Sequence, residues 1–207
     1  MSDGVKEITG QETLRQVYDQ PAEMTTKKIL DRLDDHCRRF IALSPFLTIA
    51  STSAAGTDCS PRGDEPGFVR VIDDHTLILP DRRGNNILDT LQNVLARPDV
   101  GLLFLVPGLN ETLRVNGKAR LVTDPDLLQS LAIKGKIVPS SAMEIAVEQV
   151  YFHCGRAILR ADLWNADKKA SRDDFPLLGT VLADQIKGVD AEATNKRLEV
   201  AYTTNLY

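Results

Sequence analysis

The sequence predicts a mainly β protein of the α+β class, a mostly antiparallel barrel with flanking helices. Three observations lead to this prediction. Roughly six or seven strand-like segments follow one another along the chain, mostly in hairpin order. Helical segments lie between the strands and at both ends of the chain. Strict alternation of strand and helix is missing, which argues against a doubly wound parallel sheet.

The bulk properties agree with one globular unit. The chain has 207 residues, enough for one domain with a core of its own or with a helical extension. Hydrophobic residues make up 43% and charged residues 26%, as in soluble globular proteins. The formal net charge of −4 argues against a nucleic-acid-binding protein, which usually carries a basic excess.

The cysteines and the start of the chain predict a cytoplasmic protein. Cys37, Cys59 and Cys154 lack the paired spacing of a disulfide framework, which favours a reducing compartment. Together with His36 and His153 they also lack the spacing of zinc ligands, so we expect no metal site. The polar first residues carry no signal-peptide pattern, and no stretch is apolar enough to span a bilayer.

We expect three regions along the chain. Residues 1–24 form a polar N-terminal segment with a weak helical stretch at Glu12–Tyr18. Residues 25–165 carry the barrel, and residues 166–207 form a helical extension of the same domain.

The barrel region opens with a helix and a strand. Thr25 or Thr26 caps a helix that runs to Phe40, because apolar residues recur there at helical spacing. Phe46–Ser51 is apolar and β-branched, which predicts the first strand.

A hairpin and a second helix follow. The strands Gly67–Ile72 and Thr76–Leu79 are joined by the turn signal Asp73-Asp74. Asn86 then caps a helix that ends at Arg97-Pro98. The apolar face of this helix is expected to carry Ile87, Leu91 and Leu95.

Two long strands come next. The continuous apolar run Val100–Val106 predicts a strand buried on both sides, broken by the turn residues Pro107–Asn110. Thr112–Val122 is the following strand, and Gly117 within it predicts a bulge or tight bend.

The remaining elements complete the prediction. Asp124-Pro125 starts a helix, with proline at the first helical position, that ends at Lys134–Lys136. The last expected strands are Ile145–His153 and Ala157–Trp164. The tail is expected to form two helices, Phe175–Lys187 and Ala191–Tyr202.

Two short segments at the ends of expected strands combine arginine, glycine and short polar side chains. They are Ser60-Pro61-Arg62-Gly63-Asp64 and Pro80-Asp81-Arg82-Arg83-Gly84-Asn85-Asn86. Because the chain as a whole is acidic, this local concentration of arginine predicts a site for one anion.

The chemistry of these segments suits a phosphate group. The planar guanidinium groups of Arg62 and Arg82 can each donate two parallel charge-assisted hydrogen bonds. The glycines let the main chain approach a ligand, and a helix start at Asn85-Asn86 would add free N–H groups. The pattern predicts the phosphate end of a bound cofactor. In the alternative reading, Arg62 only pairs with Asp64 or Glu65 within a turn.

Other candidate residues have a functional and a structural interpretation. His153 can hydrogen-bond a substrate or flavin, or be a satisfied buried histidine beside Cys154, the interpretation that we favour. Cys59 is either a reactive thiol near positive charge or, as we favour, a small residue at a strand end. Arg160 and Trp164 would share one face of a strand and stack at the rim of a pocket, or only pack at the surface.

Five segments occur in a fixed order along the chain: Ser60–Phe68, Leu79–Asn86, Phe104–Gly108, Glu111–Gly117 and Val150–Cys154. Together they resemble the pyridoxamine 5′-phosphate oxidase-like group of FMN-binding split β-barrels. More narrowly, they resemble a bacterial subgroup of FMN-dependent proteins with unassigned substrates. The likeness covers Thr25 to Trp164, most of the chain.

The resemblance implies an FMN-binding split barrel over residues 25–165 that works as a homodimer, with FMN at the interface. It implies that Arg62 and Arg82 hold the FMN phosphate, and that the strand at Thr112–Arg114 comes from the partner chain or lies near the flavin ring. The implied cofactor-binding residues are Ser60, Arg62, Gly63, Asp64, Pro80, Asp81, Arg82, Arg83, Asn85, Asn86, Thr112 and Arg114. The substrate-side candidates are His153, Arg160 and Trp164.

The sequence also departs from the true oxidases. Ser60–Asp64 replaces their Arg-x-Val-Leu-Leu-Lys segment, and Gly84-Asn85-Asn86 replaces Ser-Arg-Lys. The tail Thr204–Tyr207 replaces an Arg-Leu-x-Pro ending, so pyridoxamine phosphate is not the expected substrate.

Two functions are therefore open. The first is an FMN-dependent oxidoreductase that acts on an unidentified small molecule, with no assigned catalytic side chain because the flavin N5 carries the hydride chemistry. The second is a non-catalytic flavin-binding module for storage or sensing, or a related barrel that uses deazaflavin or haem.

Overall fold

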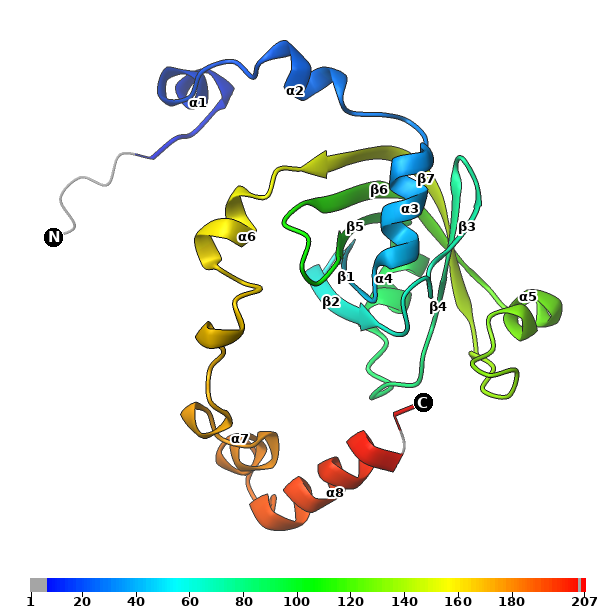
Figure 1. Ribbon diagram of the computed structural model, residues 1–207. Helices are drawn as coiled ribbons and strands as arrows, with labels where there is room; N and C mark the ends of the chain where they lie inside the picture. Colours follow the sequence, from blue (N-terminus) through cyan, green and yellow to red (C-terminus); the bar gives the residue numbers. More distant parts are fainter. Residues whose placement is uncertain (1–6, 205) are drawn as a thin grey trace, which may run out of the picture.

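The fold is built on one antiparallel sheet of seven strands in the order β2-β1-β5-β6-β7-β4-β3. Figure 1 shows the computed structural model, which describes residues 7–204 and 206–207. The strands are β1 Phe46–Ser53, β2 Gly56–Gly63, β3 Arg70–Asp73, β4 Thr76–Pro80, β5 Asp99–Leu105, β6 Thr112–Val122 and β7 Ala142–His153. β2 and β3 remain as edges, so the sheet is an open, split barrel of the α+β class, as predicted. The expectation for residues 1–6 lies outside the described residues.

Eight α-helices surround the sheet or extend from it in the described part of the chain. They are α1 Gln11–Val17, α2 Glu23–Lys27, α3 Asp35–Leu43, α4 Asp89–Ala96, α5 Pro125–Ser130, α6 Arg156–Ala161, α7 Leu178–Gln185 and α8 Ala191–Thr204. Short 3-10 turns occupy Ala166–Lys168 and Arg172–Asp174. The predicted helix start at Asp124-Pro125 is confirmed, and the Asp124 side chain caps α5 by accepting a hydrogen bond from the Leu127 N–H at 2.8 Å.

The core lies between the concave side of the sheet and helices α3 and α4. Along β5, Val100, Leu102 and Phe104 are buried, whereas Leu103 and Leu105 are only half-buried. The prediction of burial on both sides is therefore wrong for this strand. A continuous apolar run fits a one-sided strand as well, because side chains alternate between the two faces.

The helix predicted from Thr25 or Thr26 to Phe40 is wrong. Two shorter helices, α2 and α3, replace it. Asp34 starts α3 by accepting a hydrogen bond from the Cys37 N–H at 2.8 Å, a cap that competes with helix continuation. Between the helices, Leu30 exchanges two backbone hydrogen bonds with Val150 of β7.

The strand predicted at Ala157–Trp164 is also wrong, because this segment forms α6 and the turn that follows it. Short apolar runs do not distinguish helix from strand by periodicity. Here Gly155 packs so tightly on Asn110 that an added Cβ would lie 2.6 Å from that side chain. The chain turns at this contact and leaves the sheet.

Strand β2 is missing from the predicted strands, although it carries the first arginine motif. It pairs with β1 along its whole length and has an exposed outer edge. Its polar sequence lacks apolar alternation, and Pro61 argues against a strand except at an edge. Arg62 therefore lies on the last part of an edge strand rather than on a loop.

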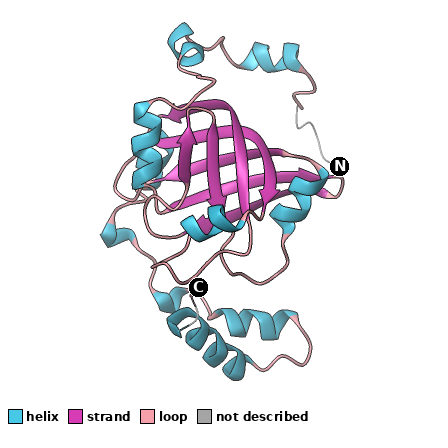
Figure 2. Cartoon of the chain, turned by 90° about the vertical axis from the view of Figure 1, so that its right-hand side faces the viewer, coloured by secondary structure: helices cyan, strands magenta, loops and turns pink. Residues whose placement is uncertain are grey.

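The terminal helices lie apart from the sheet (Figures 1 and 2). The predicted pair of tail helices is confirmed as α7 and α8, which pack on each other. The Gly179 N–H donates to Asn195 Oδ1 at 2.7 Å across this pair. Over residues 7–204 and 206–207, no helix has both the length and the apolar character needed to cross a membrane.

The predicted bulge at Gly117 is confirmed by a register shift between β6 and β7 at Asn116 and Gly117. A Cβ at Gly117 would lie 2.1 Å from the backbone oxygen of Ala146. The two long strands can therefore approach here only because residue 117 has no side chain.

We predict that Gly117→Ala lowers the free energy of unfolding by roughly 1–3 kcal/mol, because backbone must move to admit the methyl group. The measurement is urea denaturation followed by circular dichroism. Gly84→Ala is the matched control, since a Cβ there would meet no atom within 4 Å. Equal stability of the two variants would contradict this explanation of the bulge.

Candidate functional site

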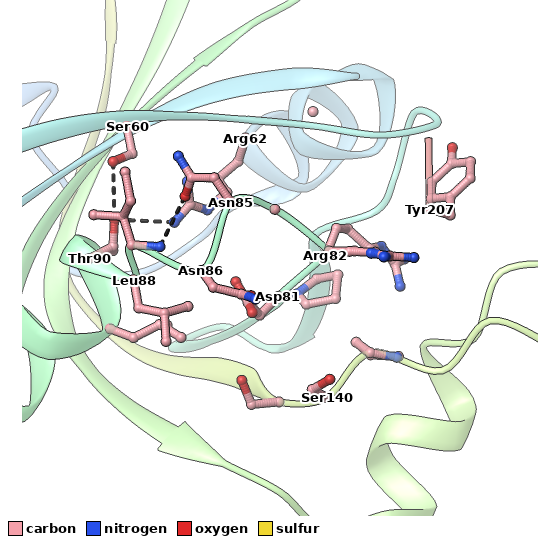
Figure 3. A pocket seen from close by; sticks show the side chains of 18 of the residues that line it. Ser60, Arg62, Asp81, Arg82, Asn85, Asn86, Leu88, Thr90, Ser140 and Tyr207 are labelled. Atoms are coloured by element: carbon pink, nitrogen blue, oxygen red, sulfur yellow. Dashed lines mark hydrogen bonds between the residues drawn. The ribbon is translucent and has the colours of Figure 1, made fainter. Parts of the chain in front are cut away.

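A cavity of about 1010 Å³ lies at one end of the barrel. Its walls come from the end of β2 (60–63), the segment from the end of β4 to the first turn of α4 (80–91) and the loop 137–141, with Phe68 and Tyr207. This volume is at the upper end of small-molecule and cofactor pockets. The structure thus brings the two arginine motifs into one pocket. Figure 3 shows Arg62 with Ser60 and Thr90 on one side and Arg82 with Tyr207 on the other.

Arg62 is held in place, but its Nε keeps an N–H without a hydrogen-bond partner. Its Nη1 donates to the Pro61 carbonyl at 2.9 Å, and its Nη2 donates to Thr90 Oγ1 at 3.1 Å. Thr90 in turn donates to Ser60 Oγ at 3.3 Å. The Nε of Arg62 is buried without a hydrogen-bond partner. The alternative reading of Arg62 as the partner of Asp64 or Glu65 does not describe this geometry, because Arg62 forms no ion pair with a described residue.

Burial destabilises the charge on Arg62. Removal from water lowers the pKa of its guanidinium, and the nearby Asp81 carboxylate opposes this shift only in part. A buried cation with an unpaired N–H is costly unless an anion can approach it. This arrangement therefore favours an anionic ligand at Arg62.

Arg82 has a different role, because its charge is already paired inside the protein. Its Nε donates to Asp64 Oδ2 at 2.6 Å, and its Nη1 donates to the Leu131 carbonyl at 3.1 Å. The Asp64 side chain is 2% exposed and that of Arg82 is 17% exposed. The other carboxylate oxygen of Asp64 accepts from the Tyr207 hydroxyl at 2.9 Å, which raises the pKa of Tyr207.

Asp81 also lines the pocket. Burial raises the pKa of its carboxyl group, and the positive charge of Arg62 lowers it by less. A charged Asp81 would repel a phosphate, whereas its protonated form would not. The electrostatics of the pocket therefore depend on the protonation of one carboxyl group.

The second motif does not start a helix at Asn86, as the sequence analysis predicts. Helix α4 begins at Asp89, after Leu88 at the N-cap position with φ 64°. Asn86 itself has φ 62°, and two non-glycine residues in the left-handed region so close together mark a strained segment. The buried face of α4 is formed by Thr90, Asn93 and Val94.

The later start of α4 changes which residues face the pocket and the solvent. Ile87 and Leu95, expected on the apolar face, are 56% and 76% exposed. Thr90 instead points to Arg62, so the first turn of α4 contributes a hydroxyl to the site. The spacing of apolar residues in the sequence correctly predicts that a helix is present here. It does not predict where α4 starts or which of its faces is buried.

Six of the predicted site residues do not line this pocket: Asp64, Thr112, Arg114, His153, Arg160 and Trp164. Thr112 and His153 are partners across β6 and β7, at the far end of those strands. Trp164 donates its Nε1–H to the Leu109 carbonyl at 2.8 Å and so holds the β5–β6 turn. The prediction that Arg160 and Trp164 share a strand face is wrong, because Arg160 lies on α6 and Trp164 follows it.

The cysteines show no functional grouping. Cys37 is buried, and burial raises the pKa of its thiol to about 12, so it stays protonated. Cys59 and Cys154 are exposed. Within the described residues, no group of three or more His, Cys, Asp or Glu side chains is placed to hold a metal ion.

Sequence reasoning missed three features of the pocket wall: Thr90, the loop 137–141 and Tyr207. Thr90 follows the second motif closely, so a correct helix start would have indicated it. The loop and Tyr207 belong to no local motif. Tyr207 reaches Asp64 from a position 143 residues away in the chain, and only the tertiary structure shows this contact.

Comparison with known proteins shows the family to which the chain belongs. Residues 33–154 match the family described as pyridoxamine 5′-phosphate oxidase. Since the match covers more than half of the chain, the protein belongs to this family. No curated protein matches the sequence.

Solved structures with a similar fold include HupZ of Group A Streptococcus. It has 19% identity and a TM-score of 0.47, with 57% of this chain and 91% of that chain covered. An FMN-binding protein from Syntrophomonas wolfei has 13% identity and a TM-score of 0.45, with 56% and 82% covered.

We predict that Asp64→Asn lowers the free energy of unfolding by about 3 kcal/mol, because it leaves the buried Arg82 cation without a counter-charge. The measurement is urea denaturation at neutral pH. Asp74→Asn is the matched control. It breaks an ion pair with Arg38 in which the Asp74 side chain is 57% exposed, so it should cost less than about 1 kcal/mol. Similar losses of unfolding free energy in the two variants would show that burial of the Asp64–Arg82 pair adds nothing to stability.

Proposed function

We propose that the protein binds FMN in this pocket and works as an FMN-dependent oxidoreductase on a small molecule. The observation that carries the proposal is the buried Nε of Arg62, which has no hydrogen-bond partner and belongs to a side chain that lines the pocket. A phosphate oxygen would satisfy this donor and neutralise the buried charge. The pyridoxamine 5′-phosphate oxidase family membership and the resemblance to FMN-binding split barrels agree with this ligand.

The proposal gives different tasks to the residues of the two motifs. Arg62 binds the phosphate directly, and Ser60 and Thr90 orient its guanidinium group. Arg82, fixed by Asp64, shapes the wall and keeps N–H groups for the ligand. The remaining proposed contacts come from the pocket-lining residues Gly63, Pro80, Asp81, Arg83, Asn85 and Asn86.

The chain's own residues would bind, orient and shield the cofactor. A bound flavin supplies hydride chemistry through its ring, so the protein needs no obligatory acid or base. Figure 3 shows several short polar side chains around the arginines, a setting that can fix a phosphorylated ligand by its polar end.

We also propose that a homodimer completes the site. Thr112 and Arg114, which the resemblance assigns to the flavin, lie outside the pocket of their own chain. A second copy could supply them. The half-buried apolar side chains Leu103 and Leu105 on the outer face of β5 would support such an interface.

We predict that Arg62→Gln weakens FMN binding by about tenfold or more, because a hydrogen bond to a charged group and a buried counter-charge are lost. The measurement is titration of apoprotein followed by quenching of flavin fluorescence. Riboflavin, which lacks the phosphate, serves as the control ligand, and its affinity should be unchanged. Arg160→Gln is the control variant, since Arg160 does not line the pocket.

The proposal fails if neither the wild-type protein nor Arg160→Gln binds FMN, or if Arg62→Gln lowers the affinities for FMN and riboflavin equally.

Whether the protein turns over a substrate is a separate question. Reduction of the bound flavin by NADH or NADPH, followed by reoxidation with a candidate acceptor, would favour the enzyme. A bound flavin that neither donor reduces would favour a non-catalytic module.

We further predict that FMN affinity falls as pH rises through the raised pKa of Asp81, because the carboxylate then repels the phosphate. Asp81→Asn should bind FMN more tightly than wild type above that pH and equally well below it. Ionisation of the phosphate itself affects both proteins, so the difference between their pH profiles is the measurement. Asp126→Asn, at an exposed position outside the pocket, should follow wild type. Parallel profiles for Asp81→Asn and wild type would contradict the role of Asp81.

A further inference from the structure

A second group of cationic and aromatic side chains lies away from the pocket. This cationic–aromatic cluster consists of Lys28 after α2, Arg114 on β6, and Tyr151 and His153 on β7. Lys28 Nζ lies 5.4 Å and the Arg114 guanidinium carbon 5.5 Å from the centre of the Tyr151 ring. The rings of Tyr151 and His153 lie 4.9 Å apart. None of the four residues lines the pocket at Arg62.

The two cations of the cluster have no acidic partner among the described residues. Lys28 Nζ donates to the Phe152 carbonyl at 2.6 Å, and Arg114 Nη1 donates to the Tyr151 hydroxyl at 2.9 Å. Both are neutral acceptors, so each cation keeps its full charge and further N–H groups. By contrast, the neighbouring Lys27 pairs with Glu23 at 2.5 Å.

His153 reports the positive potential of the cluster. Burial lowers its pKa first, and the charges of Arg114 and Lys28 lower it further. Its Nε2 is buried without a hydrogen-bond partner. A bound anion would offset these two positive charges and accept a hydrogen bond from a protonated imidazole nitrogen.

We propose that the cationic–aromatic cluster binds an oxyanion, the carboxylate or phosphate group of the substrate. The donors fit this chemistry: a guanidinium fork, an ammonium group and an imidazole surround a half-buried phenol. Lys28 and Arg114 are exposed, so a small anion can reach them from solvent. That the oxyanion belongs to the substrate rests on the proposed function; that the cluster binds an oxyanion does not.

The test follows the imidazole resonances of His153 by NMR in flavin-free, full-length protein, with His153→Gln to assign them. Sulfate is the probe for phosphate and benzoate the probe for carboxylate, because both keep a constant charge near neutral pH. We expect a saturable shift of the His153 resonances and a higher His153 pKa with either probe. The tighter probe identifies the anionic group of the substrate.

Lys28→Met should weaken probe binding about tenfold, and Lys27→Met, which removes an adjacent but paired charge, should leave it unchanged. Arg114→Gln is a second variant with the same expected loss, and circular dichroism checks that each variant is folded. Arg62→Gln should not alter the His153 response. The anion test therefore remains conclusive even if the FMN proposal fails.

The proposal is overturned if chloride at equal ionic strength produces the same His153 shifts as both probes. It is also overturned if folded Lys28→Met and Arg114→Gln bind both probes with wild-type affinity.

Discussion

The buried ion pair between Arg82 and Asp64 is the interaction on which the geometry of the pocket depends. It joins the residue that follows β2 to a residue just after β4, 18 positions further along the chain. Arg82 extends the connection to the Leu131 carbonyl, and Asp64 extends it to the Tyr207 hydroxyl. Four segments thus meet through two side chains whose charges cancel. Because the pair is nearly inaccessible to water, its loss would leave a buried charge rather than a solvated one.

With that pair internally neutral, Arg62 brings to the pocket a partly buried positive charge that forms no ion pair with a described residue, although Asp81 lies near it. Its hydrogen bonds to Thr90 and the Pro61 carbonyl fix the guanidinium without neutralising it. In our proposal, the two motif arginines have different tasks although they look alike in the sequence: Arg82 builds the wall and Arg62 binds the ligand. The cationic–aromatic cluster repeats this pattern at the far ends of β6 and β7, where neutral acceptors hold the cations in place. Two separate anions, one at Arg62 and one at the cluster, would fit this distribution of charge.

Much of the barrel could be predicted from the sequence, because β1, β4, β6 and β7 contain apolar or β-branched runs and Gly117 marks the bulge. The predictions failed where a local signal had a stronger competitor. Asp34 caps a new helix inside the expected one, and the polar edge strand β2 needs no apolar alternation. At the site, the sequence indicates both arginine motifs but not the different roles of their arginines. That division of roles depends on the pairing of Asp64 with Arg82 rather than with Arg62, and Asp64 is also buried and bonded to the distant Tyr207.

Our central proposal is that the Arg62 side of the pocket holds the phosphate of a flavin. A crystal structure of the protein grown with FMN tests it most directly. We expect an FMN phosphate oxygen within hydrogen-bond distance of Arg62 Nε, with the Arg82–Asp64 pair intact beside it. A flavin whose phosphate lies elsewhere on the protein, with Arg62 Nε still unpaired, would contradict this assignment.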